Sequence, residues 1–120
     1  MLRWLPLVLV LALLPAAACG GGPSQPEGSI KVTLTEFKFD PSSIDAKSGK
    51  AVFFLVNSGS TSHDMVITDS SGKQLAKSEL VQAGNAAVFT VDNLAAGSYV
   101  IYCDVAGHRA SGMEGQLKVS

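Results

Sequence analysis

Alternating hydrophobic and polar residues predict a strand near the start of the folded part of the chain. In segment 30–39, IKVTLTEFKF, the apolar positions alternate with polar ones up to Leu34 and resume one position out of phase at Phe37. A shift of one residue turns the buried face of a strand over. We therefore expect a β-bulge near Thr35 and Glu36.

Several later segments also have the length and composition of strands. Segment 51–57, AVFFLVN, is apolar almost throughout, which is typical of a strand near the middle of a sandwich. Only segment 73–83, KQLAKSELVQA, has a possible helical period. About seven or eight short strands separated by turn residues predict an all-β fold, a Greek-key antiparallel β-sandwich. The remaining expected strands lie in HDMVITD at 63–69, AAVFTVDN at 86–93, GSYVIYC at 97–103 and GQLKVS at 115–120.

The sequence LAAGSY, which ends at Tyr99, has the spacing of a tyrosine corner. In that motif a tyrosine hydroxyl hydrogen-bonds to nearby backbone, so we expect a structural role for this side chain. Side chains alternate between the two faces of a strand. Ile101 and Cys103 should therefore share the inward face with Tyr99, while Val100 and Tyr102 point outward.

The N-terminal segment has the composition of an export signal. Residues 1–18 carry one cation, Arg3, followed by an apolar run and three alanines. This run is too short and wrongly flanked for a spanning helix, and we expect a signal peptide. Cys19 follows a sequence that fits ordinary secretory cleavage or a lipobox, and the lipobox explains the cysteine, so we expect Cys19 to be lipidated. Residues 19–28 would then form a flexible tether, and residues 29–120 a single domain.

Charge and cysteine content narrow the class of protein. Nine Lys and Arg residues nearly balance ten Asp and Glu residues, without charge runs, which argues against nucleic acid or an anionic membrane as the partner. The chain has two cysteines. If Cys19 is acylated, Cys103 remains a free thiol in a compartment that permits disulfides. Cys103 is then either a small buried hydrophobe or a metal ligand.

The metal interpretation follows from residues close to Cys103. His108 follows Cys103 after four intervening residues, Met113 follows His108 after four more, and His63 is the other of the two histidines in the chain. Two imidazoles and a thiolate in a trigonal arrangement, with a weak axial thioether, form the blue-copper electron-transfer site. Zinc binds Cys and His readily but gains nothing from a thioether, so copper is favoured.

With these residues the chain resembles the cupredoxin family, the small blue (type 1) copper proteins that include plastocyanin, azurin, auracyanin and halocyanin. The matching residues are His63 in SHDMVI and Cys103, His108 and Met113 in YCDVAGHRASGMEG, and FKFDPSSIDAKSGKAVFFLVN is similar to the family's first strands. The resemblance implies one type 1 copper ion held by these four residues and single-electron transfer by Cu(I)/Cu(II) cycling. It also implies that the ring edge of His108 is solvent-exposed and serves as the electron port. Asp64 stands where many members have an asparagine that links the two ligand segments, so the strength of that link is open.

Several roles around the site have more than one candidate residue. Met65 competes with Met113 for the axial position, although Met113 lies in the loop between glycines. The carbonyl of Thr61 is a further candidate for approach to copper. Arg109 adds a charge to the expected docking face. Tyr102 is either a second electron exit or an ordinary strand aromatic.

The expected function is that of an electron carrier and not an enzyme. Both histidines would belong to one site, which leaves no histidine-rich second site for a substrate. The alternative is a copper-binding lipoprotein that stores or delivers the metal. We expect a monomer, tethered by Cys19 to a bacterial membrane in the periplasm or at the cell surface. Its partners would be redox proteins such as cytochromes or membrane oxidoreductases and oxidases.

Overall fold

The computed structural model describes residues 22–120, and these residues form an all-β sandwich. The expected signal peptide and Cys19 lie outside the described residues. One sheet has the strand order β2-β1-β4-β7 and the other has the order β3-β9-β8-β5-β6. The strands are β1 Ile30–Thr35, β2 Lys38–Asp40, β3 Ser43–Ala46, β4 Gly49–Asn57, β5 Val66–Thr68, β6 Gln74–Lys77, β7 Ala86–Leu94, β8 Gly97–Tyr102 and β9 Glu114–Val119.

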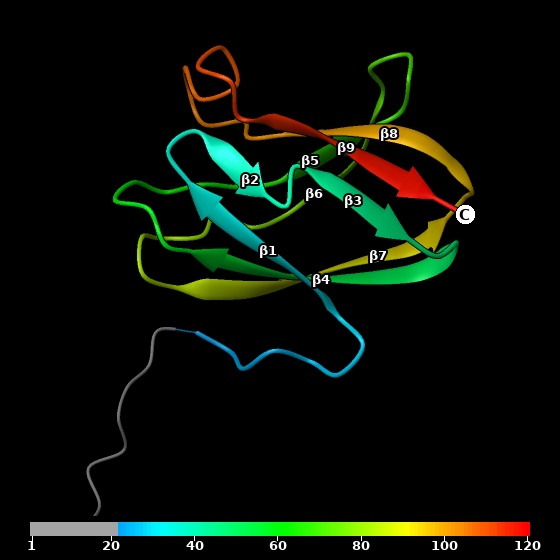
Figure 1. The fold of residues 1–120 in the computed structure, drawn as a ribbon, viewed down its shortest axis with the longest axis horizontal. Coiled ribbons are helices and arrows are strands. Elements are labelled where there is room, and N and C mark those ends of the chain that lie inside the picture. The colour runs from blue at the N-terminus through cyan, green and yellow to red at the C-terminus, as the bar shows by residue number, and fades with distance from the viewer. Residues whose placement is uncertain (1–21) are drawn as a thin grey trace, which may run out of the picture.

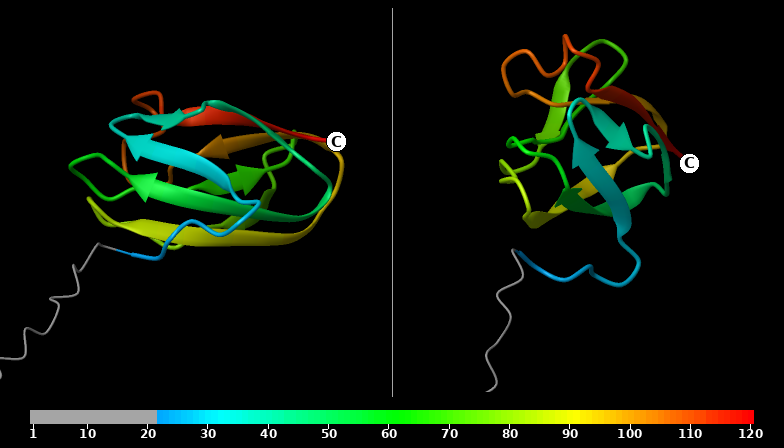
Figure 2. Two further views of the ribbon diagram at one scale, coloured as in Figure 1. Left: turned by 60° about the horizontal axis from the view of Figure 1, so that its bottom comes forward. Right: turned by 60° about the vertical axis from the view of Figure 1, so that its left-hand side comes forward.

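The predicted sandwich is confirmed, with two details that the pattern did not show. Residues 22–120 contain nine strands and not the expected seven or eight. The shortest, β2 and β5, have only three residues each. The pairs β1–β4 and β3–β9 are parallel, whereas the other pairs are antiparallel. Figure 2 shows, in its left view, β7, β4 and β1 on one side of the molecule and β9 on the other.

The phase shift after Leu34 is a hairpin and not the expected bulge. β1 and β2 pair antiparallel, with Thr35 opposite Lys38, so Glu36 and Phe37 form the turn between them. A reversal of the chain moves the apolar phase just as a bulge does, and the sequence pattern does not separate the two. The possible helix at 73–83 is likewise not formed, since this segment holds β6 and an isolated bridge from Val81 to His63.

The core lies between the two facing sheets. Phe53, Leu55 and Ile101 are fully buried, and each such side chain contributes on the order of 1.5–3 kcal/mol of transfer free energy. The tyrosine corner is present, because the Tyr99 hydroxyl donates a 2.6 Å hydrogen bond to the carbonyl of Ala95. The strand face predicted from Tyr99 is confirmed as well. Tyr99, Ile101 and Cys103 are buried, while Val100 and Tyr102 are half-buried.

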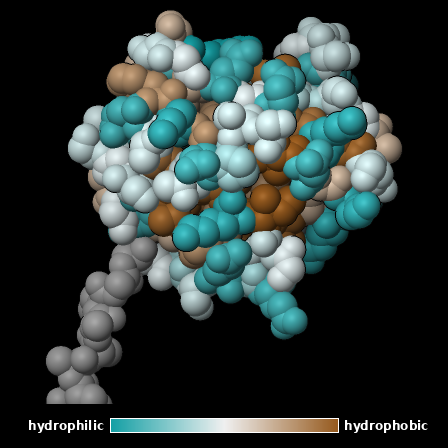
Figure 3. Space-filling model, in the orientation of Figure 1, coloured by the Kyte–Doolittle hydropathy of each residue, from teal (hydrophilic) through white to brown (hydrophobic). Residues whose placement is uncertain are grey.

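Loops from both sheets gather at one end of the sandwich. Figure 1 shows the orange loop between β8 and β9 at the left-hand end, where the β1–β2 turn and the segment after β4 also lie, opposite the C-terminus. The space-filling view of the same face shows brown apolar side chains among teal polar ones (Figure 3). Within residues 22–120 no helix is long and apolar enough to span a membrane.

Candidate metal centre

Three side chains of residue types that bind metals lie close together in the interior, at the end of the sandwich where the β8–β9 loop lies. Nδ1 of His63 lies 3.2 Å from Nδ1 of His108. Sγ of Cys103 lies 3.9 Å from Nδ1 of His63 and 3.5 Å from Nδ1 of His108. All three ligand atoms lie within 4.8 Å of one another and all three residues are buried. A single ion can therefore contact two nitrogens and one sulfur here.

Both backbone polar groups of His63 form hydrogen bonds with one residue of a neighbouring segment, Val81. Its N–H donates to the carbonyl of Val81 at 3.1 Å, and the N–H of Val81 donates to the carbonyl of His63 at 2.8 Å. The side chain of Asn57, buried at the end of β4, donates to the carbonyls of Val81 and Thr61 at 2.9 and 2.8 Å. The Thr61 carbonyl, a candidate for approach to copper, thus accepts a hydrogen bond from this amide.

The other residues of the pattern lie on the loop after β8. Cys103 follows the strand directly, and its N–H donates to the carbonyl of Met113 at 3.1 Å. The N–H of Met113 donates to the carbonyl of His108, also at 3.1 Å. Gly107 and Gly112 have φ values of +82° and +109°, which favour glycine, and they let the loop fold back on itself. The loop therefore brings Met113 beside the two other loop residues.

Burial alone does not distinguish the two candidate methionines. Met65 and Met113 are both fully buried. The backbone of Met113 is hydrogen-bonded to Cys103 and His108, whereas the N–H of Met65 donates to the hydroxyl of Ser78 at 2.9 Å. The hydrogen bonds favour Met113 as the methionine that belongs to the cluster.

A buried carboxylate links the His63 segment to the Cys103 loop. Oδ1 of Asp64 accepts a 2.7 Å hydrogen bond from the N–H of Asp104. Nζ of Lys77 lies 2.6 Å from Oδ2 of Asp104 and 3.9 Å from Oδ2 of Asp64. The link between the two segments, whose strength the residue type at position 64 left open, is thus made by an aspartate, and a lysine partly balances its charge.

A second carboxylate contacts the outer nitrogen of His63. Oε1 of Glu36 lies 3.1 Å from Nε2 of that ring, on the opposite side from the ligand atoms. Hydrogen bonds from the backbone and hydroxyl of Thr61, together with the N–H of Ser60, lower the pKa of Glu36 to about 2. Sequence spacing gave no sign that Glu36 belongs to the site, because a separation of 27 residues from His63 carries no local signal.

His108 is less exposed than the resemblance implied. Its exposed fraction is 8%, so the expected solvent-exposed ring edge is largely covered. The ring of Phe37 packs edge-on against the imidazole, with centroids 5.0 Å apart, and Phe37 itself is 39% exposed. The turn between β1 and β2 therefore places an exposed aromatic ring over the histidine, and periodicity alone did not assign Phe37 to the site.

The charge on the loop is paired within the protein. Nε of Arg109 lies 2.8 Å from Oε2 of Glu114, and its guanidinium lies 4.0 Å above the ring of Tyr102. Arg109 therefore stands at the expected docking face with part of its charge balanced by a neighbour, and Tyr102 is covered by it on one face.

The surroundings of the thiol fit a cation. Burial raises the pKa of Cys103, and the nearby Asp64 carboxylate acts in the same direction by repulsion. A metal ion stabilises the thiolate that burial disfavours. Two imidazole nitrogens, one sulfur that becomes a thiolate and a buried thioether on the adjoining segment are the donor set of a type 1 copper site.

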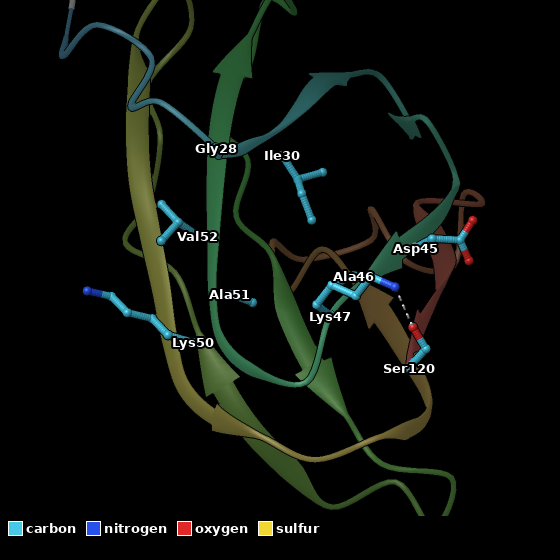
Figure 4. Close-up of a pocket in the computed structure, with 9 residues that line it drawn as sticks. All are labelled: Gly28, Ile30, Asp45, Ala46, Lys47, Lys50, Ala51, Val52 and Ser120. Atoms are coloured by element: carbon cyan, nitrogen blue, oxygen red, sulfur yellow. Dashed lines mark hydrogen bonds between the residues drawn. The ribbon is translucent and has the colours of Figure 1, made fainter.

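A separate hollow lies at another part of the surface. It has a volume of about 310 Å³ and is lined by apolar residues of β1, β3 and β4 together with Gly28, Asp45, Lys47, Lys50 and Ser120. Figure 4 shows the hydrogen bond between Nζ of Lys47 and Oγ of Ser120, which is 3.5 Å long. None of its lining residues is His63, Cys103 or His108, so this hollow is distinct from the candidate metal site.

Comparison with solved structures shows the same fold. Reduced auracyanin from the photosynthetic bacterium Roseiflexus castenholzii is 19% identical with a TM-score of 0.68, covering 77% of this chain and 96% of its own. Auracyanin B is 19% identical with a TM-score of 0.70, covering 82% and 92%. Auracyanin A, a "blue" copper protein from Chloroflexus aurantiacus, is 18% identical with a TM-score of 0.65, covering 78% and 100%.

The sequence itself matches a family. No curated protein sequence matches the chain. The model of the cupredoxin-like domain, however, matches residues 4–117, which is most of its length. The match includes the segments that carry both histidines, Cys103 and Met113, and it agrees with the sandwich observed. The protein belongs to the cupredoxin-like domain family.

Proposed function

We propose that the protein binds one copper ion through His63, Cys103, His108 and Met113 and carries single electrons. The observation that carries this proposal is the convergence of two Nδ1 atoms and one Sγ atom, within 4.8 Å of one another, in a buried place. When bound, copper supplies the one-electron change between Cu(I) and Cu(II). The similarity in fold to auracyanin A, itself a "blue" copper protein, supports the choice of metal.

The protein's own residues would hold the ligands still and keep water out. His63 is fixed by its bridge to Val81, and Cys103 is fixed by its hydrogen bond to Met113. Because His63, Cys103 and Met113, three of the four proposed ligands, are fully buried, little water reaches the ligand atoms. Fixed ligands in a water-poor setting reorganise little when charge changes, and low reorganisation favours fast electron transfer.

Electrons would leave on the side of His108. This ring lies closest to the surface among the proposed ligands, with Phe37 against it and exposed. Its neighbours Ala106, Gly107 and Ala110 are exposed and small, so they leave room for a redox partner to approach. We propose that cytochromes or membrane oxidoreductases and oxidases dock here in short-lived complexes.

The geometry favours a carrier over an enzyme or a delivery protein. Both histidines of the chain contribute to the one cluster, so a second histidine-rich copper site for a substrate is lacking. Delivery of a metal requires open ligands that an acceptor can reach. The ligand atoms here are buried, which suits a site that retains its metal through many cycles.

We further propose that the protein is exported and anchored by lipid at Cys19. Support comes from the apolar N-terminal run with its single cation and from the alanines before the cysteine. Residues 19–28 would then let the domain at 29–120 move between a membrane-bound donor and an acceptor in the periplasm or at the cell surface. Incorporation of labelled palmitate by the full chain, and its loss in Cys19→Ala, would test the anchor.

The test of the central proposal is an absorption titration with Cu(II). The chain from Gly28 onward includes all nine strands and should develop an intense red-region band at one equivalent of copper. Ascorbate should bleach the band and an oxidant should restore it over repeated cycles. A colourless complex, or copper that passes to a chelating acceptor during the cycles, would contradict the carrier and favour the delivery function.

A further inference from the structure

We propose that Glu36 is a positioning residue that orients His63 through its outer nitrogen and whose negative charge favours the oxidised state of the site. This inference rests on the proposed function, since it presumes that His63 binds copper through Nδ1. It concerns a residue outside the ligand set, on the turn between β1 and β2.

The orientation of the His63 ring leaves Glu36 in the right place. Nδ1 faces Cys103 and His108, and Nε2 faces Oε1 of Glu36 at 3.1 Å. A ring that binds a metal through Nδ1 carries its proton on Nε2, which then donates to the carboxylate. Ligand histidines commonly donate their second N–H to a carboxylate or carbonyl, and this bond sets the tautomer and the angle of the ring.

The carboxylate is itself held in position. The same Oε1 atom accepts hydrogen bonds of 2.9 Å from the N–H groups of Ser60 and Thr61, and of 2.8 Å from the hydroxyl of Thr61. Gly59 packs so closely that a Cβ there would lie 2.6 Å from Oε1. The loop before His63 therefore holds the Oε1 atom of Glu36 through three hydrogen bonds, and movement of this side chain would disturb all of them at once.

Charge distinguishes this arrangement from a neutral acceptor. The Glu36 side chain is 28% exposed and His63 is fully buried, so water screens their interaction only in part. A negative charge on the far side of the ring attracts the cation that the near side binds. The attraction is greater for Cu(II) than for Cu(I), so the carboxylate should lower the reduction potential.

Glu36→Gln in the copper-loaded protein separates charge from shape. Glutamine keeps an oxygen that can accept from Nε2, and removes the charge. We expect Cu(II) affinity to fall on the order of tenfold relative to Cu(I) affinity, which raises the potential by about 59 mV for a one-electron couple. Glu79→Gln removes the same charge from an exposed position after β6 and should leave the potential unchanged.

The outcomes separate this inference from the function on which it rests. A wild-type protein without the red-region band would overturn the function, and the inference with it. A blue wild type with equal potentials in Glu36→Gln and wild type would overturn only the role of Glu36. An equal rise in both glutamine variants would also overturn it, because the effect would then be one of net charge.

A measurement on the reduced wild type keeps the test independent of the variant's folding. In the diamagnetic Cu(I) protein, proton–nitrogen NMR should resolve a slowly exchanging Nε2–H on His63, held by the bond to Glu36. The more exposed His108 ring provides the internal comparison. A His63 Nε2–H that exchanges with water as fast as that of His108 would overturn the proposal.

Discussion

Asp64 and Asp104 form a hydrogen bond that joins the chain segment carrying His63 to the chain segment carrying Cys103. The buried carboxylate of Asp64 accepts at 2.7 Å from the backbone N–H of Asp104. Asp64 follows His63 directly, and Asp104 follows Cys103 directly, so this bond fixes the spacing between two proposed ligands that lie 40 residues apart in sequence. Lys77 contacts both carboxylates and makes a charged acceptor tolerable here.

Asp64→Ala should therefore destabilise the protein and loosen its hold on copper. The substitution leaves the N–H of Asp104 without its acceptor, which costs about 1–3 kcal/mol of unfolding free energy. Asp64→Asn keeps an oxygen acceptor and should lose much less. Urea unfolding of the three proteins measures the difference. Equal losses in the two variants would mean that the charge next to Lys77, and not the bond to Asp104, is what matters.

Cys103→Ser should abolish the intense colour and leave the fold. The thiolate supplies the charge transfer of a blue site, and a hydroxyl of similar size does not. Visible absorption after addition of Cu(II) measures the first effect, and circular dichroism of the strands measures the second. A variant that is still blue would contradict the role of Cys103.

Met113→Leu should preserve copper binding and raise the reduction potential. An apolar cap in place of the thioether favours the less charged cuprous state. Leucine has nearly the same volume, so the stability loss should stay below about 1.5 kcal/mol. Met65→Leu is the matched control, since Met65 is equally buried, and its potential should match that of the wild type. A shift in the control alone would assign the axial role to Met65.

Asp69 should make stability depend on pH at the acid end. The side chain and N–H of Ser71, and the N–H of Lys73, hold its carboxylate and lower its pKa below the ordinary value of 3.8. The folded state thus binds this proton less tightly than the unfolded state does. The stabilisation is present above the ordinary value and is lost as the pH falls below it.

The comparison with Asp69→Asn tests this assignment. The gap in unfolding free energy between wild type and variant should narrow from about pH 7 to about pH 3, because protonation removes the wild type's advantage. Asp92→Asn, at an exposed position of β7, controls for the loss of one negative charge. A gap that stays constant across this range, or that narrows equally in the control, would contradict the role of the Asp69 turn.

Sequence patterns predicted the sandwich because its strands repeat a local rule. Alternation along β8 correctly placed Tyr99, Ile101 and Cys103 inside, since side-chain direction along a strand depends only on neighbouring residues. The spacing of Cys103, His108 and Met113 was equally local, because one short loop holds all three. For this reason the candidate ligands could be named before any contact was known.

The turn at Glu36 and Phe37 shows where local rules end. A bulge and a hairpin both move the apolar phase by one position, so the pattern predicted the first where the chain forms the second. Because β1 pairs with β4, this turn lies beside the candidate metal ligands. There Glu36 contacts His63, and Phe37 packs against His108. Neither contact has a signature in sequence spacing.

The sequence by itself determined the class of fold, the inward face of β8 and the set of residues suited to copper. Only the tertiary structure decided which side chains surround that set: the carboxylate behind His63, the aromatic ring over His108 and the bond from Asp64 to Asp104. The physical reason is that strand periodicity and loop spacing arise from adjacent residues, whereas these contacts arise from sheet packing between distant ones. Sheet packing sets the surroundings of a metal, and those surroundings tune its potential.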